Sequence, residues 1–395
     1  MIDFEHACSL IAGLHERTGI ESTPLSQACG RVLARDVHAH VDSPRQRVSA
    51  MDGYAVREAD LAILPVRLPV ATTCYAGGSP APDVPRGSCA RIFTGASVSE
   101  DLDRVVIQEQ VHEKAGEAIF EQAVGSGRHI RAQGSDFRRG DMLLIAGTRL
   151  DARAVVAAAG ADRARVDVHL RPRVIVLGLG DELCAPGTAR ESELGVPESV
   201  SFGVAALVEQ WGGVCIGRVL LPDVLDILER AAGGALEKAD LVVVAGGASV
   251  GERDFAKAMF HPHGLELIFS KVAIKPGKPV WLGRAGGKLV LGLPGNPSSA
   301  LVTARLFLAP LLMRLGGGRM ADALRWIQAG LALEMAAGHE RETFVRALWY
   351  EGRVLPLPEQ DSSAQRALAQ ADVLIRRPSK ADPVQMGGCV EVLEF

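Results

Sequence analysis

The sequence predicts a multidomain α/β protein. Its parts are a central α/β domain with a mostly parallel sheet, an inserted β-rich domain, an extended linking domain and a C-terminal β-barrel domain. Three observations predict this fold class. Apolar, β-branched segments alternate with helical segments over residues 171–318. Short β-like pieces separated by Gly/Pro turns fill residues 48–136. The length of 395 residues exceeds one ordinary core and indicates about two to four domains.

The first half of the chain contains three predicted units. Residues 1–19 predict an amphipathic helix that packs with the central region, because apolar positions recur at helical spacing. This segment carries acids where a secretory signal needs a basic region. Residues 20–47 and 137–170 are β-like and partly helical, and we expect them to join into one linking domain. The inserted domain then covers residues 48–136.

The second half begins with the alternating pattern of residues 171–318. The strands RVIVLG, LVVVAGG and KLVLGL alternate with helices predicted near 201–210 and 224–237, and a long apolar helix follows Asn296. The run Gly316-Gly317-Gly318 marks a boundary. Beyond it, residues 322–395 contain the strand-like segments ETFVRALWY and VEVLEF, which indicate a small β-barrel.

Composition excludes several function classes. With 43 basic and 47 acidic residues, the net charge is −4 and there is no basic excess for nucleic acid. The seven cysteines are scattered without a CxxC pair, which favours reduced thiols in the cytoplasm over a disulfide framework or a zinc site. We find no apolar run approaching the 18 residues of a membrane span, and we expect no membrane contact.

Polar, glycine-rich segments follow three predicted parallel strands. The carboxyl ends of such strands share one edge of the sheet, where open α/β sheets place their ligands. We therefore expect these segments to form one site. They contain Asp181 and Glu182 after the first strand, Gly246, Gly247, Ser249 and Asp254 after the second, and Lys271, Lys275 and Lys278 with Pro294, Asn296 and Pro297 around the third.

The chemistry of these residues suits a phosphorylated ligand. Asn296 can cap the following helix and Pro297 suits its first turn, so the helix start should offer N–H groups to an anion. The lysines add positive charge, and the acids suggest Mg²⁺ bridging to phosphate. Each element has a plainer interpretation. Strand, turn and helix also occur in any α/β protein, Asp181 and Glu182 could cap a helix, and the Gly246 loop could be an ordinary turn.

The chain resembles the molybdopterin molybdenumtransferases of the MoeA type, which include the C-terminal enzyme domain of gephyrin. The resemblance covers nearly the whole chain, from about Phe4 to Phe395, and rests on nine motifs in order. They are SAMDGYAV at residues 49–56, IFTGASV at 92–98, VVIQE at 105–109, IRAQGSD at 130–136, AGTRL at 146–150, GDEL at 180–183, GGASVGERD at 246–254, KVAIKPGKPV at 271–280 and GLPGNPSSA at 292–300.

The resemblance implies a four-domain subunit and a homodimer whose cleft lies between the α/β domain of one subunit and the inserted domain of the other. It implies adenylated molybdopterin and molybdate as substrates, Mg²⁺ as cofactor and AMP as a product. Molybdopterin adenylyltransferase and molybdoenzyme chaperones are the implied protein partners. By motif match, functional positions are Asp52, Thr94 and Asp136 on the inserted-domain side, and Glu182, Asp254, Lys271, Lys275 and Ser362 elsewhere. Asp52 could instead be a simple turn former, and Ser362 an ordinary loop serine.

Several positions depart from the pattern of the family. Arg47 stands within a usual Phe-Asp-Asn, Leu179 within a usual Ser-Thr-Gly, Val200 within a usual Asp-Ser-Asn and Pro222 within a usual pair of aspartates, while Ser135 replaces an acid. Apolar or basic residues at such positions cannot bind Mg²⁺. Two hypotheses therefore stand: an active enzyme with a divergent pocket, or a non-catalytic molybdopterin-binding paralogue that acts as a carrier or partner protein. A scaffold role of the gephyrin kind is disfavoured, because we see no extra domain or disordered linker.

Overall fold

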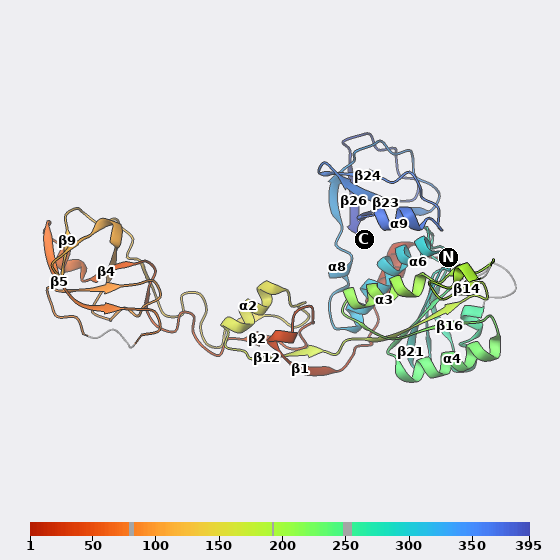
Figure 1. The fold of residues 1–395 in the computed structure, drawn as a ribbon, viewed down its shortest axis with the longest axis horizontal. Coiled ribbons are helices and arrows are strands. Elements are labelled where there is room, and N and C mark those ends of the chain that lie inside the picture. Colours follow the sequence, from red (N-terminus) through yellow and green to blue (C-terminus); the bar gives the residue numbers. More distant parts are fainter. Residues whose placement is uncertain (79–82, 192, 248–254) are drawn as a thin grey trace.

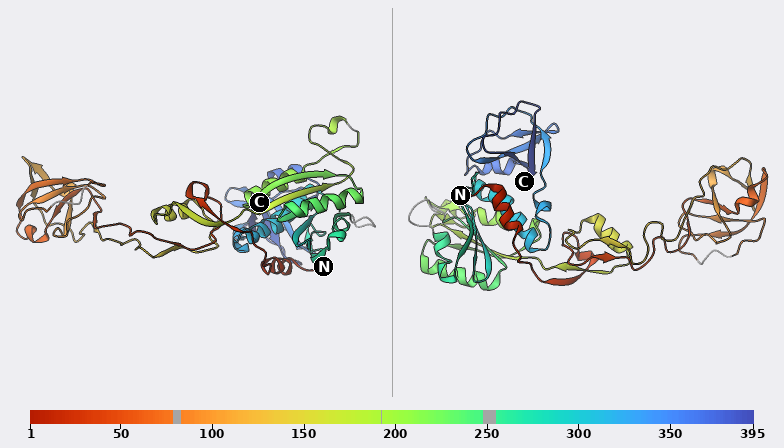
Figure 2. Two further views of the ribbon diagram at one scale, coloured as in Figure 1. Left: turned by 90° about the horizontal axis from the view of Figure 1, so that it is seen from below. Right: turned by 180° about the vertical axis from the view of Figure 1, so that it is seen from behind.

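The computed structural model describes residues 1–78, 83–191, 193–247 and 255–395. The molecule is elongated (Figure 1). The inserted β-rich domain lies at one end, a linking region with little regular structure lies in the middle, and the α/β and C-terminal parts form the other end. The same extended shape is seen from below and from behind (Figure 2).

A six-stranded sheet in the order β16-β13-β17-β21-β20-β18 forms the centre of the α/β part. The strands β13 (Arg173–Leu179), β16 (Val214–Leu221), β17 (Leu241–Ala245) and β21 (Lys288–Leu293) are parallel, and the apolar runs predict all of them but β16. Helix α3 (Val200–Gln210) contributes to the core on one face. Helices α4 (Leu225–Lys238) and α5 (Phe255–Ala258) contribute to the core on the other. A short ribbon of β14 (Leu183–Cys184) and β15 (Val196–Pro197) projects beside the sheet.

Three strands of this sheet, β16, β18 and β20, were not named in the prediction. Strands β18 (Glu266–Ser270) and β20 (Trp281–Ala285) extend the sheet by antiparallel pairing, so the sheet is mixed at one edge. Gly292 permits this arrangement, because a Cβ there would lie 1.9 Å from Nε1 of the buried Trp281. Strand β18 runs in the same direction as β21, so Lys271 follows it at the carboxyl edge of the parallel strands.

The helix after Asn296 is longer than a single element. Helix α6 (Pro297–Thr303), a π-helical turn (Ala304–Leu308) and α7 (Ala309–Leu315) form one continuous stretch. By length and composition this stretch could cross a membrane, which contradicts the expectation that no run approaches that length. Within the fold, however, 89% of its apolar window is buried, as in the core of a globular domain. Helix α1 (Phe4–Ala12) packs into the same core, with Phe4 in edge contact with Phe307.

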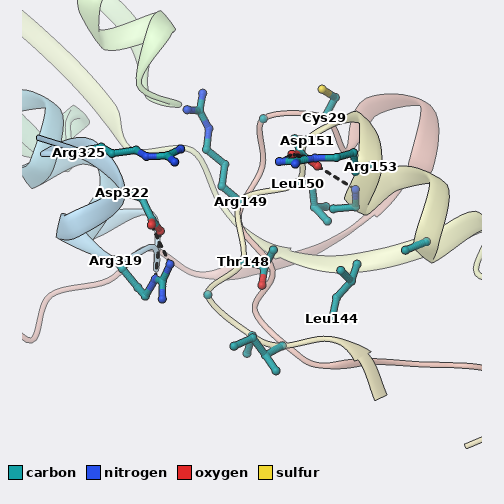
Figure 3. A pocket seen from close by; sticks show the side chains of 16 residues that line it. Cys29, Leu144, Thr148, Arg149, Leu150, Asp151, Arg153, Arg319, Asp322 and Arg325 are labelled. Atoms are coloured by element: carbon teal, nitrogen blue, oxygen red, sulfur yellow. Dashed lines mark hydrogen bonds and ion pairs between the residues drawn. The ribbon is translucent and has the colours of Figure 1, made fainter. Parts of the chain in front are cut away.

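The linking region is held by pairing between its two chain segments. Strand β1 (Ile20–Pro24) pairs with β12 (Arg165–His169), and β2 (Val37–His38) pairs with β11 (Met142–Leu144). Helix α2 (Ala152–Gly160) covers them and is capped by Asp151. A cavity of ≈ 820 Å³ separates this region from the short helix α8 (Met320–Ala323) (Figure 3). Arg153 pairs there with Asp151 and Arg319 with Asp322, and none of the predicted site residues that the structure describes lines it.

The inserted domain is a six-stranded sheet in the order β7-β4-β6-β5-β9-β8. Its strands are β4 (Gly53–Val56), β5 (Val66–Cys74), β6 (Cys89–Ile92), β7 (Arg104–Ile107), β8 (His112–Lys114) and β9 (Glu117–Phe120). Strands β3 (Val48–Ser49) and β10 (Ile130–Arg131) pair where the two chain segments enter and leave the domain.

The C-terminal part is a sheet in the order β19-β23-β25-β26-β22, with β24 paired to β23. Its strands are β22 (Ile327–Gly330), β23 (Glu342–Tyr350), β24 (Arg353–Pro356), β25 (Val373–Arg377) and β26 (Cys389–Glu394), with helix α9 (Gln365–Gln370). Strand β19 (Ile274–Lys275) comes from the α/β part and pairs with β23. The lysine-bearing segment therefore joins the two parts.

Candidate functional site

A cavity of ≈ 610 Å³ lies at the carboxyl ends of three neighbouring parallel strands, β13, β17 and β21. Residues from four predicted motifs and from the C-terminal part line it. They include Leu179, Glu182, Gly246, Gly247, Pro279, Pro294, Gly295, Asn296, Pro297, Ser363 and Gln365. The tertiary fold thus brings together segments that are more than one hundred residues apart in the sequence.

The Gly246 position requires glycine for two reasons. Its φ of +94° is in the left-handed region, and a Cβ would lie 2.5 Å from the carbonyl oxygen of Leu179. The backbone turn can therefore approach the end of β13 closely. However, the Gly246 N–H donates to the Leu293 carbonyl at 3.4 Å. Gly246 shapes the cavity wall, but this donor is already engaged.

The start of helix α6 differs from the expectation. Asn296 is the N-cap residue and Pro297 occupies the first turn, as predicted, but the Asn296 side chain forms no capping bond. It donates instead to the Ser362 hydroxyl at 2.8 Å. The Ser362 carbonyl accepts from the N–H groups of Ser298 and Ser299 at 3.0 and 3.4 Å. The prediction of open N–H groups was wrong here, because a loop of the C-terminal part supplies the cap.

The three predicted lysines lie on one loop beside the cavity. Lys271, Lys275 and Lys278 are all exposed. The loop is closed by hydrogen bonds from Lys271 N–H to the Val280 carbonyl (3.0 Å) and from Val272 N–H to the Lys278 carbonyl (3.1 Å). Pro279 of this loop lines the cavity, whereas none of the three lysines does. Among the described residues of the cavity wall, the only charged groups are two glutamates, so positive charge has to reach a ligand from this neighbouring loop.

The acidic residues differ in how far they are already engaged. Glu182 is exposed, lines the cavity and forms no side-chain hydrogen bond or ion pair with the described residues. Asp181 accepts a bond from Asp223 N–H at 2.9 Å. Glu198 was not predicted. It lines the cavity at 6% exposure, and both its carboxylate oxygens accept from Ser201, at 2.7 Å from the N–H and 2.6 Å from the hydroxyl. The signal available in the sequence was an acid three residues before a serine at the start of a predicted helix.

These contacts decide how the site could hold Mg²⁺. No group of three or more His, Cys, Asp or Glu side chains suited to a metal occurs within the described part of the chain. The predicted Ser249 and Asp254 lie outside the described residues. Mg²⁺ needs only one or two carboxylates when phosphate oxygens and water complete its shell. Glu182 fits the role of such a ligand, and the engaged Glu198 and Asp181 fit it less well.

Asp52 and Thr94 form a hydrogen-bonded pair in the inserted domain. Asp52 Oδ1 accepts from the Thr94 N–H and from the Thr94 hydroxyl, each at 2.7 Å. These two bonds, with the nearby Arg91 guanidinium, hold the pKa of the Asp52 carboxyl below its usual value. Asp136 is exposed where the chain leaves the inserted domain, and its N–H donates there to the Ser43 carbonyl at 2.9 Å.

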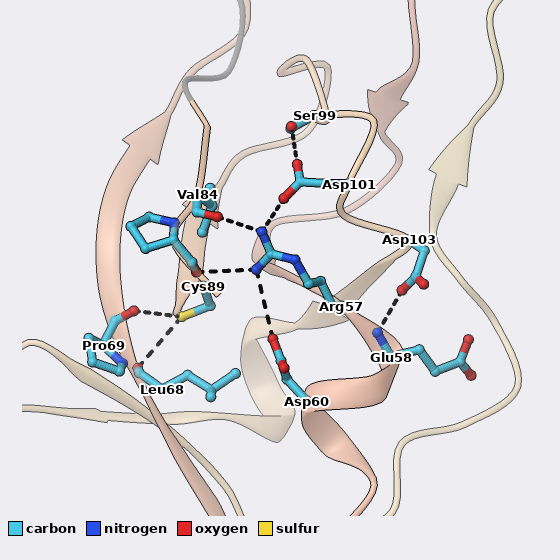
Figure 4. Close-up of polar contacts among 11 residues, drawn as sticks. Arg57, Glu58, Asp60, Leu68, Pro69, Val84, Cys89, Ser99, Asp101 and Asp103 are labelled. Atoms are coloured by element: carbon cyan, nitrogen blue, oxygen red, sulfur yellow. Dashed lines mark hydrogen bonds and ion pairs between the residues drawn. The ribbon is translucent and has the colours of Figure 1, made fainter. Parts of the chain in front are cut away.

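A second network fixes the strands that carry this pair. Arg57, directly after β4, contacts the carbonyls of Val84 and Pro85 and the carboxylates of Asp60 and Asp101 (Figure 4). These contacts join the end of β4 to the loops around it. The sheet that carries the Asp52–Thr94 pair is therefore held in place by these contacts. The inserted domain that contains the pair lies at the opposite end of the elongated subunit from the α/β part that contains the cavity (Figure 1).

Comparisons with known proteins identify the family. Residues 2–161 match the MoeA N-terminal region (domain I and II), residues 175–314 a probable molybdopterin binding domain, and residues 328–395 the MoeA C-terminal region (domain IV). The molybdopterin molybdenumtransferase of Haemophilus influenzae is 35% identical over 334 residues, which are 84% of this chain and 82% of that protein. The chain belongs to the molybdopterin molybdenumtransferase (MoeA) family.

Further MoeA-family proteins match over greater lengths. The molybdopterin molybdenumtransferase of Synechococcus elongatus is 32% identical over 389 residues, 94% of each chain. A crystal structure of a molybdopterin biosynthesis MoeA protein from Pyrococcus horikoshii has a TM-score of 0.80 and 28% identity, covering 100% of this chain and 99% of that one. A second such structure, with a TM-score of 0.87 at 24% identity, shows the same fold. The predicted multidomain α/β class is thereby confirmed.

Some of the residues that depart from the MoeA pattern line the cavity, and others lie outside it. Leu179 and Val200 line the cavity, where they present apolar surface. Arg47 lies outside it and has a structural role in the inserted domain, because its guanidinium donates to the carbonyls of Ser99 (3.3 Å) and Leu102 (2.9 Å). Pro222 lies between β16 and α4 and does not line the cavity.

Proposed function

We propose that this protein acts in molybdenum cofactor biosynthesis as a molybdopterin molybdenumtransferase. Adenylated molybdopterin and molybdate are the substrates, and AMP is released as molybdenum joins the dithiolene. The observation that carries the proposal is the cavity at the ends of β13, β17 and β21, in a chain that matches MoeA regions over nearly its whole length. A cleft at this edge of a parallel sheet is where α/β folds bind ligands.

The residues are proposed to act mainly by electrostatics. Lys271, Lys275 and Lys278 would neutralise phosphate and molybdate oxygens from the loop beside the cavity. Gly246, Gly247, Pro294, Asn296 and Pro297 would shape the wall against the ligand, with Ser362 fixing Asn296. When bound, Mg²⁺ would offset the charge of the phosphoanhydride, and Glu182 is its best-placed ligand. Cleavage adds water across the P–O–P bond and yields AMP and molybdopterin, which retains its own phosphate.

We further propose that the functional unit is a homodimer. The inserted domain, which contains Asp52, Thr94 and Asp136, lies at one end of the subunit, and the α/β part, which contains the cavity, lies at the other end (Figure 1). Catalytic roles for Asp52 and Asp136 beside Glu182, Lys271 and Lys275 therefore need a second copy. Obligate interfaces of this kind bury about 2,000 Å² or more. A stable monomer in light scattering at micromolar concentration would contradict this proposal. We place the protein in the cytoplasm, with molybdopterin adenylyltransferase and molybdoenzyme chaperones as partners.

The test is incubation of the purified protein with adenylated molybdopterin, Mg²⁺ and molybdate, with AMP release as the readout. Lys275→Ala and Lys278→Ala should each weaken ligand binding by about 10- to 150-fold, since a charge-assisted phosphate contact contributes roughly 1.5–3 kcal/mol. Lys238→Ala is the matched control, because Lys238 is exposed just before β17, at the opposite edge of the sheet. If the two loop variants bound ligand like the control, the site would have to lie elsewhere.

A non-catalytic molybdopterin-binding role is the second candidate, and the apolar Leu179 and Val200 in the cavity wall favour it. In that case binding persists while AMP release is slow, because each missing contact raises the barrier and 1.4 kcal/mol is about tenfold in rate. The double variant Val200→Asn with Pro222→Asp should then increase AMP release. If it gives no increase and the unmodified protein already turns over at about 1 s⁻¹ or faster, the carrier role is excluded.

A further inference from the structure

Four planar side-chain groups are layered at one end of the sheet in the inserted domain. The Arg91 guanidinium carbon lies 4.8 Å from the ring centre of Tyr54 and 5.0 Å from that of Phe93. The rings of Phe93 and Tyr75 are stacked, with centres 4.9 Å apart and an angle of 8° between their planes. Three aromatic rings and one guanidinium thus form a continuous series.

The strand register explains this arrangement. Tyr54 on β4 is paired with Arg91 on β6, so their side chains share a face. Phe93 is two residues after Arg91 and returns to that face. Cys74 at the end of β5 is paired with Ile92, which places Tyr75 beside Phe93.

The inner end of the series is fixed and the outer end is open. Tyr54 is 4% exposed and donates to Glu113 at 2.6 Å, and Arg91 donates to the Gly53 carbonyl and the Gln108 side chain at 3.1 and 2.6 Å. Tyr75, in contrast, is 62% exposed. An aromatic ring held by stacking on one side and open to solvent on the other is suited to one more planar group.

The series adjoins the Asp52–Thr94 pair of this domain. Asp52 is two residues before Tyr54, and Thr94 directly follows Phe93. The turn after Tyr75 is also close, since a Cβ on Gly95 would lie 3.4 Å from Ala76 Cβ. Tyr75 and the Asp52–Thr94 hydrogen bonds therefore lie at the same end of the sheet. The Asp52 carboxylate there can accept from an exocyclic amino group.

We propose that Tyr75 is a substrate-binding residue that stacks on a planar, amino-bearing heterocycle of the ligand. This inference rests on the proposed function, whose substrate contains two such rings, the adenine and the pterin. Tyr75 would provide the ring contact from the inserted domain, while the phosphates lie near the lysine loop. The stacking needs an aromatic ring at position 75 but not its hydroxyl group.

The test measures ring binding without phosphate. Adenosine and 6-hydroxymethylpterin are titrated separately against the full-length protein, with ligand-observed NMR giving the Kd. Tyr75→Ala should raise the Kd for at least one of them by about five- to hundredfold, the range of base–aromatic stacking. Tyr75→Phe should bind like the unmodified protein. Tyr350→Ala is the matched control, because Tyr350 is 52% exposed on the C-terminal hairpin, away from this domain.

The two ligands identify the ring. A loss confined to adenosine assigns the adenine, and a loss confined to the pterin assigns the pterin. Unchanged binding of both by Tyr75→Ala, or no binding of either to the unmodified protein, would overturn the inference even if AMP release proceeds normally. Conversely, an unmodified protein that binds a ring through Tyr75 but releases no AMP would support Tyr75 and refute the proposed function.

Discussion

Arg346 should connect the stability of the C-terminal part to the shape of the cavity. It is 1% exposed on β23, and its guanidinium contacts the Ser298 hydroxyl in the first turn of α6. It also donates to the carbonyls of Glu359 and Asp361 at 3.2 and 2.9 Å. Burial lowers the pKa of Arg346, but two acids nearby oppose this change. The perturbation is Arg346→Met, which retains apolar volume and removes every side-chain donor.

The expected loss in the free energy of unfolding is about 2–4 kcal/mol. A hydrogen bond from a charged donor contributes roughly 1.5–3 kcal/mol, and an unsatisfied buried partner costs about 1–3 kcal/mol. Glu359 and Asp361 are exposed, so water can replace their lost donor, whereas Ser298 is fully buried and its hydroxyl oxygen loses its donor, keeping only the bond that the hydroxyl donates to the Ala364 carbonyl at 3.3 Å. The loop that contains Ser362 and Ser363 should also loosen, and ligand binding in the cavity should weaken with it.

The assay is urea unfolding followed by tryptophan fluorescence, to which Trp349 on the same strand contributes. Arg353→Met is the control, because this arginine is exposed on the neighbouring β24 and should change stability by no more than about 0.5 kcal/mol. Ser298→Ala is also introduced into the unmodified protein and into Arg346→Met. This double-mutant cycle gives the coupling energy between the two side chains, which we expect to be at least about 0.5 kcal/mol. A loss below about 1 kcal/mol for Arg346→Met, with no coupling, would refute the reasoning.

Three further predictions concern packing, titration and thiol reactivity. Gly292→Ala should destabilise the protein by about 1–3 kcal/mol, because the added Cβ would overlap Trp281. Gly234→Ala on α4 has open space around it and should stabilise the protein slightly. A thermal melt in which both variants shift the melting temperature in the same direction would contradict this. Thr94→Val should raise the depressed pKa of Asp52. The titration is measured by NMR of the carboxyl carbon, and Thr73→Val is the control. The stabilisation from this group is present above the pKa of the unfolded state and disappears as pH falls through the folded value, so in the variant the total loss should be smaller and should be complete at higher pH. Burial raises the pKa of Cys8 to about 12, so a thiol reagent at pH 8 should label the exposed Cys29 and Cys389 first, and equal labelling of Cys8 in the native protein would argue against its burial.

Local patterns were sufficient for much of the fold. The apolar runs of β13, β17 and β21 end in glycine or proline, and such runs predict buried parallel strands whatever surrounds them. Pro297 after Asn296 predicted the start of α6 because proline is pre-shaped for a first helical turn. Strands β18 and β20 were missed. WLGRA is short and interrupted by glycine, and its place in the sheet depends on pairing with β21 and on the space that Gly292 leaves for Trp281.

The sequence alone determined the family, the order of the motifs and the residue types available for phosphate and metal. Only the tertiary structure decided which of these groups remain open to a ligand. It engaged the first N–H groups of α6 with the Ser362 carbonyl and brought Glu198 into the cavity wall. It also placed the inserted domain, which contains Asp52, at the opposite end of the subunit from the α/β part, which contains Lys275. The physical reason is that the hydrogen-bond partners of a group, and its distance from other groups, depend on residues distant in the sequence. A local motif does not contain this information.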